Sequence, residues 1–315
     1  MHSLHSELKQ LHTDGAVDDR SFAHLHELDK GTVFSVFYEL RVVLYLAVFL
    51  IVAGAGMLLK DNLDRIGPVA IAVAIGVIAA ICYYHAVRKQ LKGESRSIVG
   101  DYVLLLGALL LSADTAFIET EFHLLQNHWA LYLPLLAVIH AATAYILESR
   151  LVLSVSVAAL AGWFGVSHHV DDLFFEYGEL WTRGLQALEC SAVVLGWRIA
   201  NSKIGGYPQF NEVLDNYAIN LGFWAGLIWC QAESSLLWGV LVVTMLSVVV
   251  LRNGLLNRSE WFVVYGVVYS AIAICIVAAR LIDDALLTAL VVLSSVIGVA
   301  VLLWRIHAQL KEKST

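Results

Sequence analysis

Ten long apolar runs divide the sequence, and they constrain its fold more than any other feature. A helix needs about 20 mostly apolar residues to cross the hydrocarbon core of a bilayer. Each run approaches this length, and short charged segments separate the runs. The pattern predicts an all-α, polytopic transmembrane helical bundle of about ten spans. The runs are Val42–Leu59, Pro68–Ala86, Tyr102–Ile118, Trp129–Leu147, Leu151–Ser167, Gly184–Ala200, Asn216–Cys230, Leu236–Leu251, Phe262–Leu281 and Ala285–Trp304.

The overall composition agrees with a membrane location. Hydrophobic residues make up 59% of the chain and charged residues 15%, whereas a soluble domain has about 25% charged residues. This excess excludes an ordinary soluble globule and a disordered chain. The net charge is −7 and no basic tract occurs, which argues against a nucleic-acid partner. The expected partner is the lipid bilayer itself.

Lysine and arginine residues fix the expected orientation of the spans. With the N-terminus in the cytoplasm, the outer segments hold Lys60, Arg65, Arg183 and Arg280, and the other 16 of the 20 Lys and Arg residues lie on the cytoplasmic side. Cytoplasmic loops of membrane proteins carry such an excess of positive charge. A miscounted span would exchange alternate loops and erase the bias. We therefore expect both termini to be cytoplasmic.

The first 39 residues are too polar to cross a membrane, and their pattern is helical. Apolar residues recur at spacings of three and four on either side of the turn signal Asp14-Gly15; they are Leu4, Leu8, Leu11, Phe22, Leu25 and Leu28. We expect a cytoplasmic helical hairpin over 1–39, a transmembrane domain over 40–305 and a cytoplasmic tail over 306–315. The hairpin is a candidate docking site for a cytoplasmic protein.

Two stretches of the first half resemble a family of multi-pass bacterial inner-membrane proteins known only as a domain of unknown function. One is the pattern Leu8-x-x-Leu11-x-x-x-Gly15-x-Val17, ending in Leu25-x-x-Leu28. The other runs from Gly107 to His123 and continues through Trp129 to Trp163. The resemblance implies a short helical head followed by membrane spans in a bacterial cytoplasmic membrane. It implies no chemistry, because the family has none assigned.

The architecture is also similar to that of drug/metabolite transporters. These share ten spans, a similar length and cytoplasmic termini, and two halves of five spans would form the inverted repeat that many transporters use. The two halves of this sequence show no convincing match to each other, residue by residue. The similarity therefore implies a carrier through architecture alone, which is a weak basis for function.

Three ionisable residues lie well inside the expected spans. Ionisable side chains are costly in a bilayer and are functional candidates for that reason. Asp114 lies in the third span, His140 in the fourth and Glu189 in the sixth. One hypothesis places all three in a polar pocket open to the outside. The alternative is that each forms local hydrogen bonds in a separate packing site.

A second set of polar residues lies in the expected outer loops. Imidazole and carboxylate groups suit a divalent metal ion, and such an ion could activate water in an intramembrane hydrolase. The spacing does not favour this, because Glu119 and Glu121 share no helical face and no His-Glu-x-x-His occurs. The set comprises Glu119, Glu121, His123, His128, His168, His169, Asp171 and Asp172.

Small residues and turn signals predict further details of the bundle. Gly222-x-x-x-Gly226 and Gly162-x-x-Gly165 would each allow close helix approach. The segment Asn201–Asp215 contains Gly205-Gly206-Tyr207-Pro208 and is expected to be a connecting loop. The four cysteines form no Cys-x-x-Cys pair, which predicts neither a disulfide framework nor a zinc site.

Three functions fit these patterns. The first is a transporter or carrier for a small solute or cation, which requires a polar cavity between helices. The second is a non-enzymatic scaffold or sensor, whose interior should be filled by apolar side chains. The third is a metal-dependent intramembrane hydrolase, which must gather His and acidic side chains around an ion. No catalytic motif such as Gly-x-Ser-x-Gly occurs, so the sequence favours a protein that is not an enzyme, and we expect no cofactor.

Overall fold

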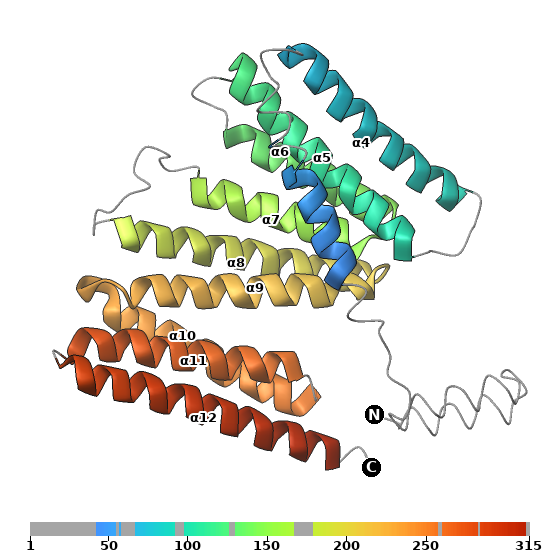
Figure 1. Ribbon diagram of the computed structural model, residues 1–315. Coiled ribbons are helices and arrows are strands. Elements are labelled where there is room, and N and C mark those ends of the chain that lie inside the picture. Colours follow the sequence, from blue (N-terminus) through green and yellow to red (C-terminus); the bar gives the residue numbers. More distant parts are fainter. Residues whose placement is uncertain are drawn as a thin grey trace, which may run out of the picture. The chain divides into compact units, whose positions relative to one another are not determined.

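The computed structural model is all-helical in the residues that it describes, which are 42–54, 57, 67–91, 98–125, 130–166, 179–257, 260–282 and 284–312. Figure 1 shows the helices in chain order. They are Val42–Gly54, α4 (Pro68–Leu91), α5 (Ile98–Phe122), α6 (Tyr132–Ile146), α7 (Arg150–Val166), α8 (Glu179–Ile204), α9 (Pro208–Trp229), α10 (Leu236–Asn257), α11 (Glu260–Leu281) and α12 (Ala285–Glu312), with the short 3₁₀ helix η2 (Glu233–Ser235) before α10.

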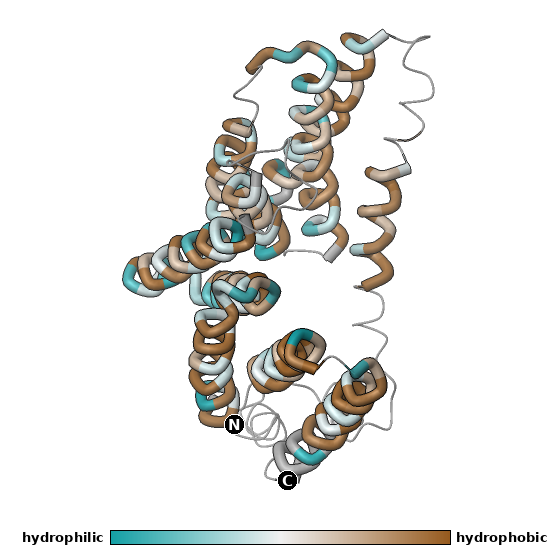
Figure 2. Tube along the Cα trace, turned by 90° about the vertical axis from the view of Figure 1, so that its left-hand side faces the viewer, coloured by the Kyte–Doolittle hydropathy of each residue, from teal (hydrophilic) through white to brown (hydrophobic). Residues whose placement is uncertain are grey.

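The helical bundle that the sequence predicts is confirmed, and apolar residues dominate most of its helices (Figure 2). Among the described helices, α4, α5, α10, α11 and α12 are long and apolar enough to cross a membrane by length and composition. Helices α6 and α7 are apolar but have only 15 and 17 residues. Helices α8 and α9 are long, with 26 and 22 residues, and carry more polar side chains. The count of ten spans therefore stays a prediction.

The chain divides into two compact units, residues 48–299 and residues 1–47 together with 300–315. The expected hairpin over 1–39 lies outside the described residues. Within residues 48–299, helices that are close in sequence pack against one another: α4 on α5, α5 on α6 and α7, α7 on α8 and α9, α9 on α10, and α10 on α11. Short connections keep consecutive helices adjacent in space, so that they pack as antiparallel partners.

The loop expected over Asn201–Asp215 is wrong, because most of that segment is helical. Helix α8 continues to Ile204 and α9 begins at Pro208. Gly205 ends α8 in the left-handed region, with a φ of 73°, and its N–H donates to the Asn201 carbonyl at 3.1 Å. Proline is well suited to the first turn of a helix, where its missing N–H costs nothing. The glycine and proline residues do mark a turn, but it is a short corner between two helices and not a long loop.

The two glycine motifs behave differently. A Cβ atom on Gly226 would lie 2.7 Å from Val243 Cγ2, and one on Gly222 would lie 3.0 Å from Leu246 Cδ1. The predicted close approach of this pair is therefore confirmed, and it joins α9 to α10. For Gly162-x-x-Gly165 the prediction is wrong: a Cβ on Gly162 would meet only Leu133 at 3.8 Å, and one on Gly165 would meet nothing within 4 Å.

Candidate functional site

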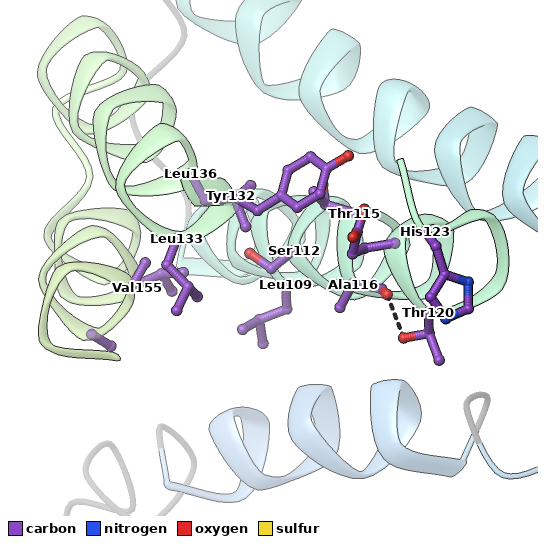
Figure 3. A pocket seen from close by; sticks show the side chains of 13 residues that line it. Leu109, Ser112, Thr115, Ala116, Thr120, His123, Tyr132, Leu133, Leu136 and Val155 are labelled. Atoms are coloured by element: carbon purple, nitrogen blue, oxygen red, sulfur yellow. Dashed lines mark hydrogen bonds between the residues drawn. The ribbon is translucent and has the colours of Figure 1, made fainter. Parts of the chain in front are cut away.

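A groove of about 500 Å³ lies between α5 and the α6–α7 helix pair (Figure 3). Ligand sites in proteins are concave, mostly apolar and of this order of volume, with a few polar groups. The groove has this volume, and its lining is apolar except for a few hydroxyl, carboxylate, imidazole and phenol groups. Its lining residues are Leu109, Ser112, Thr115, Ala116, Glu119, Thr120, His123, Tyr132, Leu133, Leu136, Val155, Ala158 and Ala159.

One face of α5 forms the long wall of the groove. Its groove-lining residues recur along the helix at spacings of three and four, as neighbours on a helix surface do. They are Leu109, Ser112, Thr115, Ala116, Glu119 and Thr120, and His123 lines the groove just after the helix ends at Phe122. At 1.5 Å per residue the stripe from Leu109 to Thr120 extends about 16 Å along the helix axis. In Figure 3, Leu133, Leu136 and Val155 come from α6 and α7 toward this stripe. The stripe is apolar at Leu109 and becomes more polar toward His123.

The polar end of the groove is centred on Glu119. This side chain is 9% exposed, and its carboxylate oxygens accept the Leu125 N–H at 3.1 and 3.3 Å. Tyr132 lines the same groove and lies close enough to this carboxylate for the two groups to interact electrostatically. No Lys or Arg among the described residues forms an ion pair with it. The end of α5 thus presents a buried carboxylate without a described cationic partner.

Farther along α5, a histidine joins the groove through a serine. His140 on α6 is fully buried, and its Nε2 lies 2.9 Å from Ser112 Oγ. The same hydroxyl donates to the Ala108 carbonyl at 3.0 Å. Because a hydroxyl carries a single hydrogen, both bonds form together only when His140 Nε2 is protonated and donates to Ser112. In the neutral ring His140 Nδ1 is then an acceptor, and it has no described partner.

The three intramembrane candidates have different surroundings. Asp114 is buried at the α4–α5 contact, where its Oδ2 lies 3.2 Å from the position that a Cβ on Gly76 would take. Residues 112 and 114 lie on different faces of α5, because residues two apart do not face the same way on a helix. Glu189 is exposed on α8. The polar partner that the structure places beside His140 is Ser112, and neither of the two acids.

The outer set is only partly described. Glu119 and His123 line the groove, and Glu121 is half-buried on α5 without lining it. His128, His168, His169, Asp171 and Asp172 lie outside the described residues. Across the described part of the chain, no three His, Cys, Asp or Glu side chains are grouped so that they could hold a metal ion.

A hydrogen-bond network that sequence reasoning missed joins α6, α8 and α9. Asn201 is 2% exposed; its Oδ1 accepts the Tyr145 hydroxyl, and its Nδ2 donates to Asn211 Oδ1 and to the Tyr207 carbonyl, each at 2.9 Å. Trp197 Nε1 donates to the Tyr145 hydroxyl at 2.9 Å. The signal was available in the two asparagines, but they lay in a segment interpreted as a loop.

A second polar contact ties α9 to α11. The Tyr269 hydroxyl donates to Asn220 Oδ1 at 2.6 Å, and the Tyr269 ring stacks on Phe223 with centroids 4.5 Å apart. Hydrogen bonds of this kind hold membrane helices together, because an apolar solvent supplies no hydrophobic force between them. Both networks use polar side chains for packing, which separates them from the groove, where polar groups face open space.

Comparison with known proteins bears on the first half of the chain. Searches of the curated proteins and of the solved structures found no match. A family model does match residues 10–153, which include α4, α5 and α6 and therefore most of the groove wall. Over those residues the predicted resemblance is confirmed: this is a membrane protein whose sequence matches the family described as "Predicted membrane protein (DUF2157)".

Proposed function

We propose that this protein is a membrane carrier for a small solute and that the groove between α5, α6 and α7 is its solute-binding site. The observation that carries the proposal is the polar stripe on α5. A helix that only packed against its neighbours would be expected to present apolar side chains on that face. Here Ser112, Thr115 and Glu119 instead line an open volume of about 500 Å³.

The surroundings of the stripe suit reversible binding. Glu119 is anchored by the Leu125 N–H, and Ser112 is anchored by His140 and by the Ala108 carbonyl. Each side chain is thus held in place while it still borders the groove. Preorganised polar groups in an apolar site bind a ligand at a low cost in ordering, which is what a carrier needs in order to take up and release a solute.

A scaffold or sensor remains the second candidate, and the packing of α7, α8 and α9 favours it. Their shared core is filled by fully buried side chains, among them Val157, Val194, Phe210 and Leu214. A bundle filled in this way holds its shape and offers no solute path in that region. The two candidates differ in where function resides: a carrier depends on the groove, and a scaffold depends on the outer surface of the bundle.

Blocking the groove separates the two candidates. Ala158 lines it on α7, and Ala158→Trp would fill much of its apolar part. Ala192→Trp is the matched control, because Ala192 is exposed on α8 and does not line the groove. The measurement is uptake by proteoliposomes of a radiolabelled panel of small cations, anions and neutral solutes, compared with protein-free liposomes.

A carrier should take up at least one solute of the panel, should lose that uptake in Ala158→Trp and should keep it in Ala192→Trp. Equal uptake by liposomes with and without protein across the whole panel would contradict the proposal. So would a transported solute whose uptake is the same in Ala158→Trp as in the unmodified chain. Either result would favour the scaffold.

A further inference from the structure

We propose that the groove between α5, α6 and α7 takes an amphiphilic organic cation, with its ammonium group at Glu119 and its apolar body directed along α5 toward Leu109. This inference rests on the proposed function, and it names the class of ligand for the same site. It depends on three features of the groove: the sign of the charge at its polar end, the apolar character of the rest, and its volume.

The charge at the polar end of the groove is negative from two sources. Glu119 supplies a carboxylate that is 9% exposed, and no Lys or Arg lines the groove among the described residues. The carboxylate also lies in the last turn of α5, which ends at Phe122. The C-terminal end of a helix carries a partial negative charge from its free carbonyl groups and favours cations. An anionic ligand would be repelled there by both.

Tyr132 completes a site for an ammonium group. Tyr132 lines the groove together with Glu119 and interacts electrostatically with its carboxylate, so the ring borders the space near the charge. An aromatic face attracts an ammonium group through the ring quadrupole. In Figure 3 the Tyr132 ring lies above the α5 stripe near Thr115, on the side where the head of a ligand would enter. A carboxylate and an aromatic ring together distinguish a cation from a neutral hydrogen-bonding head.

The remainder of the groove fits an apolar body. Beyond Ala116 the walls are formed mainly by Leu109, Leu133, Leu136 and Val155, and Ser112 is the polar group among them. From Glu119 to Leu109 the helix rises about 15 Å, which sets the length of the body. Burying apolar surface there contributes roughly 25 cal/mol per Å², so the body supplies affinity while the head supplies selectivity.

A free cation fits better than a bilayer phospholipid. A phospholipid with an amine head also carries a phosphate, which would be drawn close to the buried Glu119 carboxylate together with the amine. Like charges in a partly buried site are repelled at a cost that solvent screens only weakly. A volume of about 500 Å³ also suits one chain and not two. We therefore commit to a single-chain amine or quaternary ammonium compound.

The test compares two photoreactive probes that differ only in their heads. Both carry a dodecyl chain with a diazirine at its end; one has a trimethylammonium head and the other a sulfonate head. The purified full chain in dodecyl maltoside is irradiated with each probe over a range of concentrations. Mass spectrometry then gives the labelled peptides and the half-saturating concentration. Glu119→Gln removes the charge and keeps an acceptor for Leu125, and Glu121→Gln is the matched control.

We expect saturable labelling of α5, α6 or α7 by the ammonium probe alone. Glu119→Gln should raise its half-saturating concentration roughly 10- to 100-fold, as the loss of a charge-assisted contact does, and Glu121→Gln should leave it unchanged. Equal saturable labelling by both probes in the unmodified chain, where no folding defect can intervene, would overturn the cation assignment and leave the carrier proposal standing. Absence of saturable labelling in the groove by the ammonium probe would also overturn the cation assignment, and the carrier proposal would then be decided by the uptake panel and Ala158→Trp.

Discussion

The α8–α9 helix pair and α12 show opposite relations between hydropathy and burial. Helix α12 has the highest mean hydropathy of the five apolar candidate spans, yet none of its residues over 285–303 is buried. Helices α8 and α9 are not apolar enough to be candidate spans, yet they hold Val194, Asn201, Phe210, Leu214 and Phe223 at or near full burial.

The difference follows from the solvent that each surface meets. Lipid tails are as apolar as leucine, so that an apolar helix gains little by leaving lipid for protein. What draws helices together in a bilayer is close packing and hydrogen bonding. The α8–α9 pair supplies both: Asn201 bonds to Asn211, and Trp229 Nε1 donates to the Trp181 carbonyl at 3.0 Å. The hydropathy of a helix therefore indicates whether it lies in the membrane, whereas its polar and small residues indicate where it packs against other helices.

The largest expected effect concerns whether α9 of this pair crosses the bilayer. The positive-inside rule predicts that the α8–α9 corner is cytoplasmic and that the α9–α10 turn is outside. A cysteine introduced at Gly206, which is exposed at the corner, should react with an impermeant maleimide only after the cytoplasmic face is opened. One at Gln231, exposed in the turn, should react from outside in intact cells. The effect is all-or-none.

Background labelling is controlled by first replacing the four native cysteines, of which Cys82, Cys190 and Cys230 are buried. Reaction of both introduced cysteines from the same side of the membrane would show that α9, which lies between them, does not cross. The α8–α9 pair would then differ from α12 because α9 does not span the bilayer, and the expectation of ten spans would be wrong.

The next largest effect concerns two glycines. A Cβ on Gly184 of α8 would collide with the Trp229 indole, whereas one on Gly298 of α12 would meet nothing within 4 Å. Gly184→Ala should therefore displace Trp229 and destabilise the bundle by about 1–3 kcal/mol, as overpacking does. Gly298→Ala should be neutral or slightly stabilising, because alanine is the better helix former. Thermal unfolding in detergent measures both, and equal shifts in melting temperature would remove the contrast.

Removing one side-chain amide should cost somewhat less. Asn201→Ala deletes the bonds to Tyr145, Asn211 and the Tyr207 carbonyl and leaves buried partners unsatisfied, which costs about 2 kcal/mol. Ser294→Ala on α12 is the control, because Ser294 is exposed and bonds only within its own helix, to the Val291 carbonyl. Denaturation by sodium dodecyl sulfate gives the two unfolding free energies. A loss at Ser294 as large as that at Asn201 would contradict the argument.

The smallest effect is expected where α11 meets α9. Tyr269→Phe keeps the stacking on Phe223 and removes the hydrogen bond to Asn220. Hydrogen bonds between membrane helices contribute about 0.6 kcal/mol on average, so a destabilisation of roughly that size is expected in the same assay. Asn220→Ala combined with Tyr269→Phe should cost little more than Asn220→Ala alone, because the two changes share one bond. If the destabilisations caused by Asn220→Ala and Tyr269→Phe add in full, the hydrogen bond between these two residues is not the source of the stabilisation.

The groove was only partly predictable. Sequence reasoning selected Glu119, His123 and His140, because a carboxylate or imidazole near a long apolar run is conspicuous, and all three now lie in the groove wall or directly behind it. It did not select Ser112, Thr115 or Tyr132, because hydroxyl residues are common in membrane helices and carry no charge to attract notice. It grouped Asp114 with His140 because both are ionisable residues inside expected spans, and that pattern does not tell which face of a helix a side chain occupies.

The sequence alone determined that the chain is a helical membrane protein and where most helices lie. The physical reason is that lipid solvates only apolar side chains and satisfies no backbone hydrogen bond, so that long apolar runs have to be helices. The tertiary structure decided which faces meet. It placed Ser112 beside His140 and Asp114 beside Gly76, and it buried Asn201 and Phe210 of the α8–α9 pair while leaving every residue of α12 over 285–303 unburied. Those outcomes depend on shape and on hydrogen-bond partners far apart in the chain, which a hydropathy pattern does not record.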